Sequence, residues 1–425
     1  MERKIDQYYC KWKNDVIRKP LILYGAKQIG KTFSVLNFGK KEYKNTIYFN
    51  TDNNYELLSL FKKERSTEKI ILKMSLLSGE TILKEDSLII LDNVVDNNIV
   101  KGLKIFGSEH SKYHIIAITS KKEKLSEFKG EELQFKAMSS VDFEEYLWAK
   151  GEKSLAEIIK ESFYKKKTCA FHKVALDLFQ DYIETGGFPE IVLASIEGRS
   201  SYELSALKQK ILDIYKKEIA LTSNLIDIVR GIEVLNSIPQ QLKKANKKFQ
   251  YGLIGTGKRS KEYENSIAHL VSNELVYRSY KVESIKSPLS SCKEKDSFKL
   301  YAPDEGLLYM MLHLNRKQFL TDENLKEILY ENHIAKTIAE GGFALYYYQS
   351  GGKAEVNFVI QNRMGQIMPI ELTIKSNSKA KSLSVFMKKF TVTQAYRITE
   401  NNFSTKKEVR YIPIYATFCL KENRI

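Results

Sequence analysis

A short segment near the start of the chain has the residue types and spacing of a phosphate-binding loop. It follows the apolar run 21–24 and reads Gly25, Ala26, Lys27, Gln28, Ile29, Gly30, Lys31 and Thr32, with Phe33 next. The two glycines let the backbone curl so that its N–H groups point inward at phosphate oxygens, assisted by the start of the following helix. Lys31 can reach the β- and γ-phosphates, and the Thr32 hydroxyl can ligate Mg²⁺. The segment therefore predicts a binding site for ATP and Mg²⁺.

A carboxylate that supports the metal is expected at the end of a neighbouring apolar strand. Asp92 ends the run 87–91 and can hold Mg²⁺ directly or through water. ATPases of this type usually place a glutamate next, where it polarises the attacking water, but this chain has Asn93. An amide cannot accept a proton, and loss of a general base typically costs about 10²–10⁴ in rate. Hydrolysis is therefore predicted to be slow or absent, unless Asp96 substitutes for the missing base.

One further hydroxyl is a candidate for the catalytic set. Ser120 closes the apolar run 114–119, where it could sense the γ-phosphate or cap a helix. The candidate catalytic residues are therefore Lys31, Asp92, Asn93 and Ser120, and the candidate metal ligands are Thr32 and Asp92.

The chain must position these residues on more than one domain. Its 425 residues predict two or three domains, and 43% hydrophobic residues favour globular packing. No apolar run approaches the roughly 18 residues of a membrane span, the start lacks an apolar signal region, and the four cysteines lack metal-ligand spacing. These features predict a soluble cytoplasmic protein. The net charge of +16 fits either a polyanionic partner or a lysine-rich solvated surface.

The order of apolar and helical patterns predicts an α/β fold built from several parts. Residues 1–150 alternate strands and helices, as in a parallel P-loop sheet, with strands expected at 21–24, 46–50, 69–73, 87–91, 114–119 and 132–137. A helical lid is expected over 151–231, with a helix that ends at Pro239 just beyond it. A winged-helix-like unit with a short lysine-rich helix is expected over 232–310. A last α/β unit is expected over 320–425, with strands near 344–348, 354–360 and 367–372.

The winged-helix-like region carries a cluster of basic residues with Phe249 and Tyr251 among them. The basic residues are Lys243, Lys244, Lys247, Lys248, Lys258, Arg259 and Lys261. Such a cluster could neutralise DNA phosphates, with strongly salt-dependent binding. The alternative is a solvated face on a domain that is used for packing.

An ordered series of motifs resembles a large prokaryotic group of AAA+-type ATPases that carry a C-terminal restriction-endonuclease-like domain. Besides the phosphate-binding loop and Asp92, the matching segments are 141–147, 186–190, 246–251, 298–301, 304–308 and 355–360. The resemblance implies an AAA+-like core, a winged-helix middle and a nuclease-like end of the PD-(D/E)xK type.

The nuclease-like end departs from the pattern that the resemblance implies. Metal-dependent nucleases of this type need converging carboxylates for Mg²⁺ and a lysine two residues beyond the last acid. Glu331 and Glu371 match acids of the pattern, but Asn357 and Thr373 replace an acid and the lysine, with Lys375 two residues further on. We therefore expect a binding or structural relic.

Taken together, the sequence predicts a nucleotide-dependent switch that binds ATP and Mg²⁺. Three alternatives stay open: a DNA-stimulated ATPase, an ATP-gated nuclease, and a binding module for DNA or protein that ignores nucleotide. A protein partner or self-association also stays open.

Overall fold

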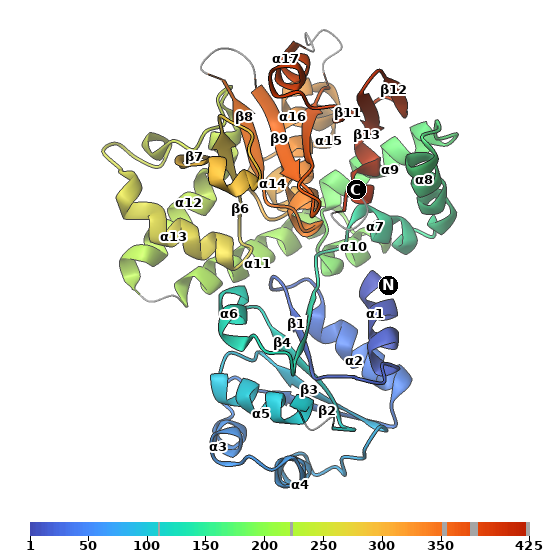
Figure 1. The fold of residues 1–425 in the computed structure, drawn as a ribbon, viewed down its shortest axis with the longest axis vertical. Coiled ribbons are helices and arrows are strands. Elements are labelled where there is room, and N and C mark those ends of the chain that lie inside the picture. Colours follow the sequence, from blue (N-terminus) through green and yellow to red (C-terminus); the bar gives the residue numbers. More distant parts are fainter. Residues whose placement is uncertain (109–110, 222–223, 351–354, 375–380, 422–425) are drawn as a thin grey trace. The chain divides into compact units, whose positions relative to one another are not determined.

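The computed structural model describes residues 1–108, 111–221, 224–350, 355–374 and 381–421 (Figure 1). The chain divides into two compact units. Unit 1 comprises Met1–Ser140 with Ser272–Glu274, and unit 2 comprises Val141–Val271 with Leu275–Ile425.

Unit 1 is built around a sheet of five parallel strands in the order β2-β3-β4-β1-β5. The strands are β1 (Leu21–Tyr24), β2 (Asn45–Asn50), β3 (Ser87–Asp92), β4 (His114–Thr119) and β5 (Gln134–Ala137). The helices are α1 (Lys4–Lys13), α2 (Lys31–Glu42), α3 (Tyr55–Lys63), α4 (Thr67–Ser78), α5 (Asn97–Ser108) and α6 (Leu125–Phe128). Every residue of β3 and β4 is buried, as expected for strands covered on both faces. The predicted parallel α/β sheet is confirmed.

The parallel direction of the strands collects their carboxyl ends at one edge of the sheet. β4 pairs with both β1 and β3, so it lies between the strand that leads into the phosphate-binding loop and the strand that ends at Asp92. The residue after β4 is Ser120. The sheet order therefore places Ser120 between the loop and Asp92.

One predicted strand of this unit is wrong. Residues 69–73 lie inside α4, which is capped by the Ser66 side chain and ends at Gly79 in the left-handed conformation. A short continuous apolar run is compatible with either a buried strand or a helix, and its periodicity alone cannot separate them. The N-cap and the terminal glycine are the signals that identify a helix here.

Unit 2 combines helices with a mixed sheet of eight strands in the order β12-β13-β11-β10-β9-β8-β6-β7. The strands are β6 (Tyr277–Val282), β7 (Lys293–Tyr301), β8 (Tyr346–Gln349), β9 (Glu355–Gln361), β10 (Ile367–Leu372), β11 (Ala395–Thr399), β12 (Ser404–Lys406) and β13 (Val409–Pro413). The helices up to residue 272 are α7 (Phe143–Ala149), α8 (Lys153–Lys165), α9 (His172–Thr185), α10 (Pro189–Ile196), α11 (Ser201–Ala220), α12 (Leu225–Lys243) and α13 (Ser260–Ser272). The later helices are α14 (Glu305–Met311), α15 (Arg316–Thr321), α16 (Glu323–Glu340) and α17 (Lys381–Phe390).

The region expected to form a winged-helix-like unit contributes to this larger sheet. The hairpin β6–β7 is antiparallel, but β6 also pairs in parallel with β8, so residues 277–301 share a sheet with the strands beyond residue 340. The helix predicted to end at Pro239 instead continues to Lys243, with Pro239 inside it and buried like Leu235 and Ile238. The short lysine-rich helix expected after it is instead an irregular segment over 244–250.

Two of the motifs behind the family resemblance meet in the core of unit 2. The carboxylate of Asp304, at the start of α14, accepts hydrogen bonds from the N–H groups of Gly187 (2.7 Å) and Leu307 (3.1 Å). Lys336 of α16 donates to Asp304 (3.3 Å) and to Glu305 (2.7 Å). Burial alone would raise the pKa of Glu305, but Lys336 and a hydrogen bond from His333 outweigh it and lower that pKa to about 2. The motifs therefore hold α9, α14 and α16 together through buried, charge-balanced polar contacts.

A glycine is required where α14 approaches the end of α9. A Cβ atom added at Gly306 would lie 2.4 Å from the carbonyl oxygen of Thr185 and 2.8 Å from the nitrogen of Gly186. Both are backbone atoms, so they cannot move aside as a flexible side chain can.

We expect Gly306→Ala to lower the free energy of unfolding by at least about 2 kcal/mol, because overpacking a close contact forces the backbone apart. Urea denaturation followed by circular dichroism measures the change. Gly252→Ala is the matched control, since a Cβ atom there meets no heavy atom within 4 Å. Equal midpoints for the two variants would contradict the close approach.

Candidate functional site

The backbone of the segment 25–32 has the curled form of a phosphate-binding loop. Gly25 has φ of 152°, and a Cβ atom there would lie 2.2 Å from the carbonyl oxygen of Met138, so only glycine fits. Gly30 has φ of 88° and ψ of 20°, which is the left-handed conformation, and it is the N-cap of α2. The loop therefore ends where the positive end of the α2 dipole begins, which is a favourable place for an anion.

The ammonium group of Lys31 lies inside the loop and is buried. It donates to the carbonyl oxygens of Gly25 (2.8 Å) and Ala26 (2.6 Å) and to the Ser120 hydroxyl (2.9 Å). The 3-10 turn after β4 is capped from Lys121, so Ser120 is not its N-cap. The structure therefore places the Ser120 side chain beside the lysine that would contact phosphate.

Asp92 faces the end of the loop from β3. Its Oδ2 atom accepts hydrogen bonds from the Thr32 hydroxyl (2.7 Å) and the Tyr48 phenol (3.0 Å), and its Oδ1 atom accepts from the backbone N–H of Asn93 (2.9 Å). Thr32 and Asp92 are thus side by side, as predicted for a shared Mg²⁺ site.

Tyr48 is a member of this site that the sequence did not identify. It lies on β2, and burial together with the charge of Asp92 raises its pKa to about 12, so the phenol remains a hydrogen-bond donor at neutral pH. Tyr48 reaches Asp92 because β2 pairs with β3. In this pairing Tyr48 lies opposite Ile90, which is two residues before Asp92. The contact between Tyr48 and Asp92 therefore becomes visible only once the strand pairing is known.

Asn93 occupies the position after Asp92 and connects β3 to the end of β2. Its side-chain amide donates to Oδ1 of Asn50 (3.2 Å), and its carbonyl oxygen accepts from the Thr51 hydroxyl (2.8 Å). Asn93 has φ of 60°, a left-handed conformation that asparagine tolerates better than most residues. The carboxylate of Asp96 accepts from the N–H of Asn98 (2.6 Å) at the start of α5. This contact is that of a helix-capping residue, which weakens Asp96 as a substitute base.

The N-terminal residues support the loop from behind. The buried guanidinium of Arg3 donates to the carbonyl oxygens of Ile29 (3.1 Å) and Ser139 (2.7 Å), and the Tyr9 hydroxyl lies 2.9 Å from the Ser34 hydroxyl of α2. These contacts join α1 to the loop, to α2 and to the segment after β5. The role of Arg3 could not be predicted from residue spacing, because these two acceptors are backbone atoms that lie 26 and 136 residues away.

The nuclease-like residues of unit 2 form a different kind of site. Glu331 of α16 is buried and accepts hydrogen bonds from Lys247 (2.6 Å), Lys299 (3.2 Å), Tyr301 (2.7 Å) and Asn357 (3.2 Å). Burial alone would raise the pKa of Glu331, but the two ammonium groups outweigh it and hold the pKa well below its usual range. Two lysines thus occupy the positions around the acid where a metal-binding site would need further carboxylates.

Of the remaining members of the predicted nuclease-like set, Asn357 contacts Glu331, whereas Glu371 and Thr373 have other partners. The carboxylate of Glu371 instead pairs with Arg397 of β11, at 2.6 Å and 2.8 Å. Asn357 links Glu331 to the backbone N–H of Leu372 (3.0 Å), and the N–H of Thr373 donates to Ile398. Lys375 lies outside the described residues. Within the described ranges, no three His, Cys, Asp or Glu side chains are grouped so that they could hold a metal ion.

The basic cluster proposed for DNA is only partly a surface feature. Lys247 is buried against Glu331, Lys248 is half-buried, and Lys258 pairs with Glu233 (3.5 Å). Phe249 is buried too, stacked on Phe298 with ring centroids 5.5 Å apart. Lys243, Lys244, Arg259 and Lys261 are exposed. The prediction that Lys247 belongs to a basic surface is therefore wrong.

Comparisons with known proteins agree with the geometry of unit 1. Residues 17–147 match a family model described as an AAA domain, whereas 176–318 and 326–417 match two models described as domains of unknown function (DUF8612 and DUF4143). No curated protein matches the chain. The loop, Lys31, Thr32 and Asp92 on a parallel sheet, together with this match, define an AAA+-type P-loop nucleotide-binding domain.

Solved structures show distant similarity only. A Signal Transduction ATPase with Numerous Domains (STAND) protein with a tetratricopeptide repeat sensor from Pyrococcus horikoshii is 14% identical with a TM-score of 0.29, over 80% of this chain and 45% of that protein. Drosophila ORC bound to DNA is 14% identical with a TM-score of 0.29, over 73% of this chain and 95% of that chain. The Aeropyrum pernix ORC1 protein in complex with DNA is 12% identical with a TM-score of 0.27, over 78% of this chain and 91% of that chain. This chain thus spans less than half of the STAND protein, and likenesses at this level carry no argument about function. No described helix is long and apolar enough to cross a membrane.

We expect Glu331→Gln to lower the free energy of unfolding by about 3 kcal/mol at pH 7, because it removes the buried carboxylate that Lys247 and Lys299 share. Because the folded pKa of Glu331 is depressed, its contribution is present above the unfolded pKa of about 4.3 and is lost as the pH falls. The variant should therefore differ most from the wild type at neutral pH and least in acid. Urea denaturation across a pH series measures both effects.

Glu327→Gln is the matched control for this experiment. Glu327 lies on the same helix, is 3.4 Å from Lys247 and has a side chain that is 36% exposed. Its loss should change stability by no more than about 0.5 kcal/mol. A similar loss for both variants would contradict the central role of Glu331.

Proposed function

We propose that the chain is a nucleotide-dependent switch that binds ATP with Mg²⁺ and hydrolyses it slowly or not at all. The observation that carries the proposal is the pairing of a complete phosphate-binding site with Asn93 at the position of the usual base. Two contacts support binding, those of Lys31 with Ser120 and of Thr32 with Asp92, while the Asn93 amide is hydrogen-bonded to Asn50.

The residues of the site fit the phosphates and the metal. Lys31 is a buried cation that contacts the carbonyl oxygens of Gly25 and Ala26 and the Ser120 hydroxyl, and a charge-assisted hydrogen bond to an anionic phosphate is stronger than one to a neutral oxygen. Thr32 and Asp92 offer a hydroxyl and a carboxylate, which are the hard oxygen ligands that Mg²⁺ prefers. When bound, Mg²⁺ would neutralise phosphate charge. Ser120 would orient the terminal phosphate through its contact with Lys31.

The contacts of Asn93 also suggest how occupancy could be transmitted. Asn93 contacts Asn50 and Thr51 at the end of β2. Asn54 follows shortly after: its backbone N–H donates to the carbonyl oxygen of Thr51 (3.4 Å), and its side chain caps α3 by accepting from the N–H of Leu57 (3.1 Å). A shift of Asn93 when the γ-phosphate is present would therefore be passed to α3. This coupling is the switch that we propose.

We expect the wild-type protein to bind ATP in a Mg²⁺-dependent manner, with turnover far below that of an ATPase that retains its base. Lys31→Ala should abolish binding, because it removes the cation at the phosphates. Isothermal titration calorimetry and a phosphate-release assay measure binding and turnover. Rapid hydrolysis by the wild type would disprove the slow switch.

Asn93→Glu, or the isosteric Asn93→Asp, should raise turnover by about 10²-fold or more, because a carboxylate at this position can accept the proton of water. Two carboxylates are tested because glutamate tolerates the left-handed backbone less well than aspartate. Asp96→Asn is the control and should leave turnover unchanged, since its side chain still accepts the capping hydrogen bond. If Asp96→Asn removes residual hydrolysis, Asp96 is the base after all.

A second candidate function, contact with DNA, is supported by the four exposed basic residues Lys243, Lys244, Arg259 and Lys261. Reversing all four to glutamate should weaken duplex DNA binding, measured by fluorescence anisotropy, and lower the slope of log affinity against log salt by up to about 4. Reversal of Lys11, Lys40, Lys41 and Lys44 changes the net charge equally and is the control. Equal effects of the two sets would contradict a defined DNA surface.

The charge-balanced surroundings of Glu331 weigh against an ATP-gated nuclease.

A further inference from the structure

Helix α4 of unit 1 has apolar residues on two faces. Ile70, Ile71 and Met74 are buried in the core of the unit, as expected for one apolar face. Leu72 and Leu76 lie on the other side and are 62% and 75% exposed, and Leu77 is 40% exposed. A surface helix normally carries polar residues there, and a helix that is apolar all round is normally covered. The second face of α4 therefore has the composition of a contact surface.

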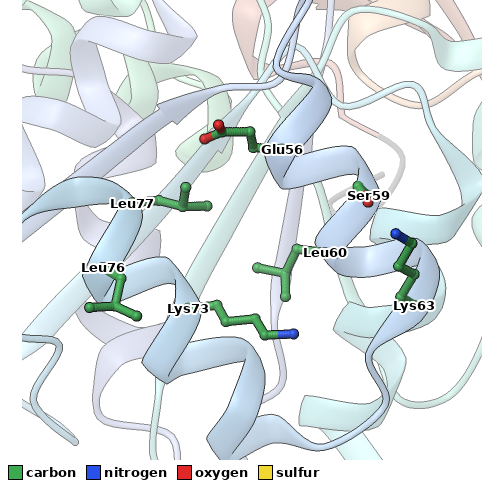
Figure 2. A pocket seen from close by; sticks show the side chains of 7 residues that line it. All are labelled: Glu56, Ser59, Leu60, Lys63, Lys73, Leu76 and Leu77. Atoms are coloured by element: carbon green, nitrogen blue, oxygen red, sulfur yellow. The ribbon is translucent and has the colours of Figure 1, made fainter.

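A groove of about 340 Å³ lies between this face and α3. Glu56, Ser59, Leu60 and Lys63 line it from α3, and Lys73, Leu76 and Leu77 line it from α4 (Figure 2). Leu60 is buried and points into the groove, and Leu76 and Leu77 face it from the opposite helix. The volume is at the lower end of the range of roughly 300–1,000 Å³ that is typical of ligand pockets.

The lining of the groove contains one acidic and two basic side chains. Figure 2 shows Glu56 beside Leu77 at the top of the view, with Lys73 below Leu60 and Lys63 to the right of Leu60. Lys73 is 3.6 Å from Glu64 and its side chain is 53% exposed, so this contact leaves much of the ammonium group accessible. An occupant must therefore offer apolar side chains to the three leucines and negative charge to the two lysines. A nucleic acid meets the second requirement but not the first.

We propose that the groove between α3 and α4 binds an amphipathic helical segment of a protein partner, with leucine-like anchors on one face and carboxylates that meet Lys63 and Lys73. Anchors spaced by three or four residues fit a groove between helices, and the carboxylates supply charge complementarity. This docking surface does not depend on nucleotide binding. Its position on α3, the helix that follows Asn50 and Thr51, places it next to the segment that contacts Asn93.

The test uses the full chain and two synthetic helical peptides that share their leucine positions and differ only in carrying glutamates or lysines. Fluorescence anisotropy of the labelled peptides measures the affinity. The wild type should bind the glutamate peptide at least about tenfold more tightly than the lysine peptide, a difference of about 1.4 kcal/mol. Leu76→Ser should weaken binding about tenfold. Lys63→Glu combined with Lys73→Glu should reverse the preference between the peptides.

The controls separate docking from misfolding and from other occupants. Leu76 is exposed, so its replacement should leave the circular dichroism spectrum and the unfolding midpoint unchanged. Leu83→Ser alters an exposed leucine that does not line the groove and should bind as the wild type does. Equal affinity for both peptides, or no effect of Leu76→Ser, would overturn the proposal. Self-association that Leu76→Ser abolishes would assign the groove to a second copy of the chain, and displacement of the peptide by duplex DNA would assign its lysines to nucleic acid.

Discussion

The parallel direction of β1, β4 and β3 is the constraint on which the candidate nucleotide site depends. Because these strands are neighbours and end at one edge of the sheet, the loop after β1, the hydroxyl after β4 and the carboxylate of β3 are brought within hydrogen-bonding distance. None of the three groups is close to another in sequence. The full burial of β3 and β4 fixes their register, and with it the distance between Lys31 and Asp92.

The buried lysines of the two units have different surroundings. In unit 1 the ammonium group of Lys31 contacts the carbonyl oxygens of Gly25 and Ala26 and the Ser120 hydroxyl, next to the N-terminus of α2, which favours an anion. In unit 2 the lysines near Glu331 are already neutralised by carboxylates, with Lys299 bonded to Glu331 and Glu355. A site of the first kind is suited to binding, whereas a site of the second kind is suited to holding elements together. This difference, rather than the residue types, separates the two candidate sites.

Local patterns in the sequence predicted the parts of the fold that depend on local chemistry. β1, β4 and β10 have the predicted bounds, and the loop, Thr32 and Asp92 lie together as expected. The errors have two origins. The run 69–73 belongs to a helix whose N-cap and terminal glycine are local signals, whereas the hairpin after residue 276 belongs to a larger sheet that tertiary contacts define. Charge shows the same limit, because Lys208, Lys247, Lys299 and Lys336 are buried and contribute nothing to a basic surface. Tyr48 and Arg3 could not be found, since their partners come from strand pairing and from backbone oxygens.

The misassigned run and the proposed docking surface have one physical origin. Residues 69–73 resemble a strand because apolar residues continue around α4 instead of keeping to one face. A helix with a single buried face would have shown a helical period, and the prediction would have been correct. The core cluster takes Ile70, Ile71 and Met74 from α4, and the leucines of the outer face are not part of it. Exposed leucines are unfavourable in water, and the proposed partner would cover the outer face of α4. The lack of a clear helical period in α4 is therefore consistent with a binding surface on that face.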